Sequence, residues 1–278
     1  MKMKAIFIVL NAVLGAAFLV IFLTPLFLLG SDWFDIFWTR NWPIAVLFVV
    51  TLGAVDTYFL LNWRLFQGLE KEDWASVAGT LEHRIFRGGP IMASNVRILL
   101  NTYLVTSSTD SILALEAYLL KRKDTLIPRF SLAFGIPHLL SRDTGEAETF
   151  FRRLLIQPRL ADREWVKWNH AFSLLQLRKT EEARQELESL GGKVTDPVLL
   201  LLSLYLLDVL ARNDSDLEAK VAARRDQLKT SHTPVLLQKA IEKSSGNLQV
   251  VVLSRLLQDA AQWLYADSRS VPVSAEIR

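Results

Sequence analysis

The stretch WNHAFSLLQLRKTEEARQELESL, residues 168–190, decides the fold. Its apolar residues recur at steps of three and four, which is the spacing of one face of an α-helix. A polar turn, Arg178-Lys179-Thr180, separates two such helices. Neither helix buries its apolar face alone, so the stretch predicts a helix pair that must stack on further pairs.

The same pattern recurs along the chain at a fixed interval. The dipeptide Glu-Ala opens the second helix of a pair at Glu146-Ala147, Glu182-Ala183 and Glu218-Ala219, each 36 residues after the last. A small residue at this position lets two helices approach closely, and bulky apolar residues fill the groove of the next pair. We therefore expect the chain after Arg64 to be helical throughout, with helix pairs stacked between residues 90 and 250.

At these residues the sequence resembles the tetratricopeptide repeat (TPR) family. That family places a large-then-small pair in the first helix and a small residue in the second. Here His170-Ala171 with Ala183, and Phe134-Gly135 with Ala147, match those places. The resemblance implies an α-solenoid, a right-handed superhelix of helix pairs whose concave face binds peptides or proteins. The unit at 197–228 lacks the large-then-small pair, which leaves divergent helical repeats of another kind as the alternative.

Two apolar runs precede the repeats. They extend over residues 5–29 and 43–62, and a transmembrane helix needs about 20 apolar residues. Residues 30–42 connect them and are rich in tryptophan, which is typical of the membrane–water boundary. The pattern predicts a two-span transmembrane hairpin in residues 1–63. The alternative is a cleaved signal peptide, but the apolar region of such a peptide is only about 7–15 residues long.

Charge predicts the orientation of this hairpin. Lys2 and Lys4 precede the first run and Arg64 and Lys71 follow the second, whereas the connection holds one base, Arg40. Basic residues that flank spans stay in the cytoplasm. Both ends of the hairpin, and the repeat domain, are therefore expected on the cytoplasmic side of a bacterial inner membrane.

Two polar residues, Asn11 and Asp56, fall inside the predicted spans. Such groups are costly in lipid, so they contact each other, contact a partner span or reach headgroup water. Asp56 lies close enough to the span end to favour headgroup water. Asn11 shares a small-residue face with Ala12, Gly15 and Ala16, where either the second helix of the hairpin or a partner protein packs.

Composition argues against several classes of function. The 278 residues include no cysteine, which rules out a disulfide framework, a thiolate metal cage and a cysteine nucleophile. The net charge is only +3 and both signs are interspersed, so no basic stripe for nucleic acid is expected. The four histidines show no metal-binding spacing. We therefore expect no catalytic site, no metal and no cofactor, and neither a nucleic-acid partner nor a small-molecule substrate.

Arginines on polar helix faces and one tryptophan are the predicted partner-binding residues: Arg152, Arg153, Trp165, Arg224 and Arg225. A solvated helix face is the simplest interpretation of the arginines, and recognition of an acidic partner tail is the more specific one. An exposed tryptophan would anchor an interface, whereas a buried one would belong to the core.

The predicted fold is all-α, with a transmembrane hairpin in 1–63, a TPR-like helical repeat domain in 64–266 and a disordered tail in 267–278. The predicted function is a membrane-anchored, non-enzymatic scaffold that binds a partner protein through its repeats. One alternative is a subunit of a larger membrane complex, for transport, secretion or envelope assembly, whose hairpin packs against other spans. Another is an enzyme with a divergent site, which a cavity lined by His138, His170 and carboxylates would reveal.

Overall fold

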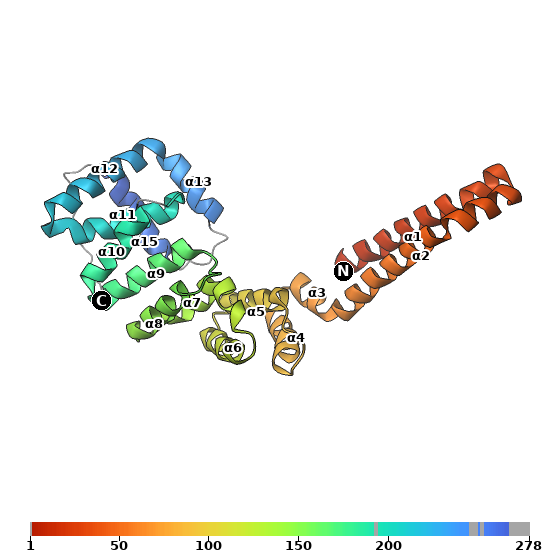
Figure 1. Ribbon diagram of the computed structural model, residues 1–278, viewed down its shortest axis with the longest axis horizontal. Coiled ribbons are helices and arrows are strands. Elements are labelled where there is room, and N and C mark those ends of the chain that lie inside the picture. The colour runs from red at the N-terminus through yellow and green to blue at the C-terminus, as the bar shows by residue number, and fades with distance from the viewer. Residues whose placement is uncertain (1, 192–193, 245–249, 251–252, 267–278) are drawn as a thin grey trace. The chain divides into compact units, whose positions relative to one another are not determined.

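The computed structural model describes residues 2–191, 194–244, 250 and 253–266 (Figure 1). Within these ranges the chain consists of helices and connections without a strand, which confirms the predicted all-α class. The tail that the sequence predicts to be disordered, 267–278, lies outside the described residues.

The chain divides into two compact units, Met1–Thr102 and Tyr103–Arg278. The helices of the first unit are α1 (Lys2–Leu29), α2 (Ser31–Leu61), α3 (Trp63–Glu70), α4 (Trp74–Phe86) and most of α5 (Ala93–Val105). Those of the second unit are α6 (Thr109–Arg122), α7 (Ser131–Leu140), α8 (Thr144–Leu155), α9 (Arg163–Gln176), α10 (Thr180–Gly191), α11 (Pro197–Leu210), α12 (Ser215–Ser231), α13 (Pro234–Ser244) and α15 (Ser254–Tyr265).

Two long apolar helices, α1 and α2, lie side by side as an N-terminal hairpin (Figure 1). The Phe7 ring stacks on Phe59 with centroids 3.9 Å apart, and Phe18 stacks on Phe48 at 4.8 Å. Early residues of α1 thus meet late residues of α2, so the two helices are antiparallel. Both are long and apolar enough to cross a membrane.

The turn of the hairpin is much shorter than the sequence predicts. Gly30 alone joins α1 to α2, whereas the predicted connection covers residues 30–42. Gly30 has a φ of 85°, a left-handed backbone that glycine adopts without steric cost. No glycine or proline follows before Pro43, so nothing in the connection stops a helix. The second apolar helix therefore covers Trp33–Leu61 instead of 43–62.

The first unit continues past the hairpin, because α3 packs on α1, α2 and α4. Arg84 of α4 also reaches the end of α2, where its guanidinium donates to Oδ1 of Asn62 (2.6 Å) and to the carbonyl of Leu61 (2.9 Å). These hydrogen bonds satisfy carbonyl and amide oxygens that the end of a helix leaves open. The boundary between the units accordingly follows Thr102, whereas the sequence predicts one after residue 63.

In the second unit each helix from α7 to α12 packs on its neighbours along the chain. The small residues at the predicted close approaches are enclosed: Ala147, Ala171 and Ala183 are fully buried. Gly135 of α7 lies directly against α8, where an added Cβ would be 2.6 Å from Cζ of Phe151. Small residues therefore set the helix spacing in the first two predicted repeats.

The third predicted repeat departs from this pattern. Ala219 is exposed, and α12 instead buries Leu217, Val221 and Leu228. α11 is apolar on all sides, and α13 and α15 cover it together with α10 and α12. The end of the chain thus returns onto α11, so the first helix of the third pair is enclosed. A helix that is apolar all round requires such cover.

Candidate functional site

Glu116 of α6 is the centre of a buried polar cluster in the second unit. The residue is 6% exposed, and its Oε2 lies 2.8 Å from Nε2 of His138. Its Oε1 accepts a hydrogen bond from Nη2 of Arg153 at 2.9 Å, and the His138 ring stacks on Phe150. A buried carboxylate is costly unless it is paired, and here both oxygens have a partner.

A second polar cluster surrounds His170 of α9. Its Nε2 lies 3.6 Å from Oε1 of Glu148, and its Nδ1 lies 3.8 Å from Oε1 of Glu186. Arg152 pairs with Glu148, and Lys167 pairs with Glu186, each at 3.2 Å. His170 is 7% exposed, and neither ring nitrogen has a hydrogen-bond partner. The imidazole is therefore held between two carboxylates that are themselves neutralised by cations.

The two clusters share one spacing. His138 follows Glu116 by 22 residues, His170 follows Glu148 by the same interval, and the second pair begins 32 residues after the first. In both clusters, a histidine on the first helix of a pair faces a glutamate on the helix before it. Sequence analysis missed these glutamates and Glu186, although the repeated Glu–His interval was a readable signal.

His138 contacts Glu116, whereas His170 contacts Glu148 and Glu186, so the two histidines belong to different clusters. Their side chains are 14% and 10% exposed. The clusters join α6 to α7 and α8 to α9, and Arg153 adds a link from α8 back to α6. Their geometry fits polar bonding between helices.

Trp165, predicted as a partner-binding residue, is instead part of the core. It is 7% exposed, and its indole N–H donates to Oδ2 of Asp196 at 3.2 Å. The other carboxylate oxygen of Asp196 accepts from the backbone N–H of Val198 at the start of α11. The tryptophan therefore connects α9 to the N-terminus of α11, and its ring is not an exposed anchor.

Arg225 is also engaged within the unit. Its guanidinium donates to the backbone carbonyls of Leu264, Trp263 and Ala266 and lies 4.7 Å from the centroid of the Trp263 ring. These carbonyls are the open acceptors at the end of α15. Arg225 thus fastens the returning helix α15 to α12.

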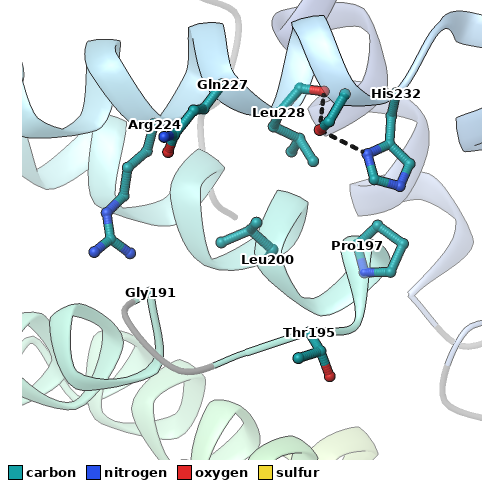
Figure 2. A pocket seen from close by; sticks show the side chains of 9 residues that line it. Gly191, Thr195, Pro197, Leu200, Arg224, Gln227, Leu228 and His232 are labelled. Carbon is teal, nitrogen blue, oxygen red and sulfur yellow. Dashed lines mark hydrogen bonds between the residues drawn. The ribbon is translucent and has the colours of Figure 1, made fainter.

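Arg224, the neighbour of Arg225, has a different environment. It lines a cavity of about 230 Å³ formed by the end of α10, the start of α11 and the second half of α12 (Figure 2). Figure 2 shows its side chain extending from α12 toward Gly191. Within the described ranges Arg224 makes no ion pair, whereas Arg152 and Arg153 pair with glutamates. The structure therefore separates the five predicted partner-binding residues and does not gather them into one surface.

An ion pair joins the first half of α10 to the N-cap residue of α12. Nη1 of Arg184 lies 2.7 Å from Oδ2 of Asp214, and Nε of Arg184 donates to Glu188. The backbone N–H of Leu217 and the Arg184 guanidinium lower the pKa of Asp214 below its usual value. The hydrogen bond to Glu188 and the charge of Asp214 raise the pKa of Arg184.

The two polar residues of the hairpin are bonded to each other. Nδ2 of Asn11 donates to Oδ1 of Asp56 at 2.9 Å, across the interface of α1 and α2. The sequence favoured contact of Asp56 with headgroup water, and the structure shows this inter-helix bond. Gly15 and Gly53 do not lie at the interface, because a Cβ added to either would meet nothing within 4 Å. Aromatic rings pack across the hairpin, and the small residue Ala45 of α2 is also buried.

Comparison with known proteins relates the second unit to a bacterial family. A family model described as an uncharacterised Treponema protein matches residues 111–266, which is more than half of the chain. An uncharacterized protein of Treponema pallidum (strain Nichols) is 27% identical over 288 aligned residues, covering 95% of this chain and 88% of the relative. No solved structure matches the chain. The chain therefore belongs to the family of uncharacterised Treponema proteins that this model describes.

Proposed function

We propose that this protein is a membrane-anchored interaction scaffold, held in the bacterial inner membrane by α1 and α2, whose second unit binds a partner protein. The exposure of the hairpin carries the proposal, since only 6% of the apolar window of either helix is buried. Ile6, Phe27 and Leu61 are 65%, 80% and 71% exposed. Contact of such surface with water costs about 25 cal/mol per Å², which a lipid environment removes.

The flanking charges support a cytoplasmic location for both units. Lys4 and Arg64 are exposed at the end of the hairpin where the chain enters α1 and leaves α2. The opposite end, at Gly30, is followed by Trp33 and Trp38, residues that suit the far membrane boundary. This arrangement matches the positive-inside rule for a hairpin with both ends in the cytoplasm.

The repeated Glu–His contacts support a TPR-like stack over α6 to α10. Stacked helix pairs present extended surfaces of the kind that bind proteins. Because α11 is covered by the returning helices, the proposed binding surface lies on the second helix α8 rather than along the first helices. The side chain of Arg152 on α8 is 62% exposed. Exposed arginines are suited to acidic partners.

An anchor exchange with site-specific crosslinking tests this proposal. Residues 1–61 are replaced by an unrelated two-span anchor that leaves Asn62 and Arg84 in place. A photoreactive residue replaces Arg152, or Lys71 of the first unit as a matched exposed control. Irradiation of cells then crosslinks this residue to neighbouring proteins. A scaffold gives one discrete adduct from position 152 with either anchor and none from position 71. Absence of that adduct with the native anchor would contradict the proposal.

A second candidate function is a subunit of a larger membrane complex, and the hairpin itself favours it. Within the described residues one carboxylate oxygen of Asp56 is bonded, by Asn11, so the other can accept from a donor on another span. Gly15 and Gly53 face open space, where small residues let a further helix approach closely. If crosslinking at Arg152 is lost on anchor exchange while the protein stays folded, this second function replaces the first.

A further inference from the structure

We propose that the cavity lined by Arg224 binds a small aliphatic carboxylate. This site goes beyond the scaffold function and does not depend on it. The cavity lies between the end of α10, the start of α11 and the second half of α12 (Figure 2). Its lining combines one cation, several polar side chains and an apolar wall, which is the usual composition of a small-ligand site.

The guanidinium of Arg224 supplies the charge that selects the ligand. It makes no ion pair within the described part of the chain, unlike Arg152, Arg153 and Arg184, which all pair with carboxylates. The second half of α12 adds to the positive field, because it carries Arg224, Arg225 and Lys229 and a single acid, Asp226. A planar guanidinium fork matches a carboxylate with two parallel hydrogen bonds.

Gly191 makes room for this cation at the end of α10. A Cβ on Gly191 would lie 3.1 Å from Nη1 of Arg224, closer than ordinary van der Waals contact. The guanidinium is therefore held against the backbone of α10 on one side. A larger residue at this position would require the guanidinium to shift by a few tenths of an ångström.

Polar groups on the opposite side of the cavity are held in place by the fold. The hydroxyl of Ser231 bonds to the carbonyl of Leu228 and lies 2.9 Å from Nδ1 of His232. The hydroxyl of Tyr265 donates to the backbone carbonyl of His232 at 2.7 Å. Ser231 and His232 therefore line the cavity in positions that the fold fixes.

The apolar wall and the volume limit the ligand to a short aliphatic acid. Pro197, Leu200 and Leu228 supply the wall. The cavity volume of about 230 Å³ lies below the roughly 300–1,000 Å³ of drug-sized ligand sites, so it suits a small acid. A short-chain carboxylate can place its head at Arg224 and its tail against the leucines.

Methyl NMR of the full-length protein in lipid nanodiscs tests the site directly. With ¹³C-methyl leucine, the signals of Leu200 and Leu228 report the cavity wall. We expect sodium butyrate to shift both signals saturably at constant ionic strength, and butyramide, its neutral counterpart, to leave them unchanged. Equal shifts with the two compounds, or no saturable shift with butyrate, would overturn the proposal.

Variants on the same helix assign the effect to one cation. Arg224→Gln is expected to weaken butyrate binding by about tenfold or more, the scale of a lost charge-assisted hydrogen bond. Lys229→Gln removes the same charge from an exposed position outside the cavity and is expected to leave binding unchanged. Equal weakening by both variants would show general charge attraction and refute a built site. Because no partner protein takes part, the result is independent of the crosslinking test above.

Discussion

The hairpin and the helix stack of the second unit use aromatic residues in opposite ways. Trp33 in α2 is 59% exposed, whereas Trp168 in α9 is fully buried and stacks on Phe172. In the hairpin the stacked ring pairs Phe7–Phe59 and Phe18–Phe48 connect α1 to α2. Most other apolar side chains of these two helices are exposed. The second unit has an interior of its own, while the hairpin depends on its surroundings to cover its apolar surface.

Polar side chains show the same contrast. The hairpin places one hydrogen bond, Asn11 to Asp56, between its helices. The second unit encloses whole ionic clusters around Glu116 and His170 and surrounds each carboxylate with partners. Burial of the Glu116 charge is tolerated because both of its oxygens are paired, and these pairs connect α6 to α7 and α8.

The largest expected effect comes from truncating the same residue type in both regions. Trp168→Ala should lower the free energy of unfolding of the second unit by about 3–5 kcal/mol, because it empties a packed interior. Trp33→Ala should change that free energy by less than about 0.5 kcal/mol, since its ring is exposed. Urea titration of the full chain in detergent, followed by circular dichroism, measures both. Equal effects would erase the contrast between the regions.

Breaking one ionic cluster should have the next largest effect. Glu116→Ala leaves His138 and Arg153 without their shared acceptor, and we expect a loss of about 3 kcal/mol in the free energy of unfolding. The exposed Glu218→Ala is the control, with an expected change within about 0.5 kcal/mol. If Glu116→Ala is as mild as the control in the same titration, the cluster does not bind the helices together.

The Asn11–Asp56 hydrogen bond should contribute less free energy of stabilisation than the Glu116 cluster. A double-mutant cycle of Asn11→Leu and Asp56→Leu isolates its coupling energy, which we expect to be about 0.6 kcal/mol, the average for polar contacts between membrane helices. Unfolding of the hairpin in micelles provides the measurement. A coupling energy of zero would mean that each side chain is satisfied by other groups.

The smallest expected effect is a loss of stability at low pH, when Asp214 becomes protonated. Because the pKa of Asp214 is lowered in the folded chain, its stabilisation is complete above the ordinary aspartate value of about 3.9. That stabilisation is lost as the pH falls through the lowered value. The stability advantage of the native protein over Asp214→Asn should therefore shrink below about pH 4. The neighbour Asp216→Asn serves as control, and a difference that stays constant between pH 3 and 6 would contradict the prediction.

Local patterns in the sequence predicted the all-α class and the presence of two apolar N-terminal helices, because helix periodicity and apolar length are properties of short windows. The spacing of Ala147 and Ala183 likewise marked true close approaches. The connection at 30–42 was misjudged, since its polar and aromatic residues resemble a loop although Gly30 alone makes the turn. Composition did not reveal that residues 31–42 continue as helix.

Contacts between residues far apart in the chain could not be predicted from these local sequence patterns. The return of α15 onto α11 depends on Arg225 meeting the carbonyls around Trp263, residues 38 apart in the chain. Whether Trp165 is core or surface depends on α11, which begins more than 30 residues later. The Glu–His clusters were within reach of sequence reasoning, because their interval of 22 residues occurs twice.

Single-cysteine labelling tests the central claim, a hairpin that crosses the membrane with the second unit on the inner side. The chain has no native cysteine, so Ser31→Cys at the turn and Ser189→Cys on α10 each create one reporter. In right-side-out membrane vesicles, a membrane-impermeant maleimide should label position 31 at once and position 189 only after detergent is added. Labelling of position 189 in intact vesicles, or release of the whole chain by carbonate washing, would contradict the account.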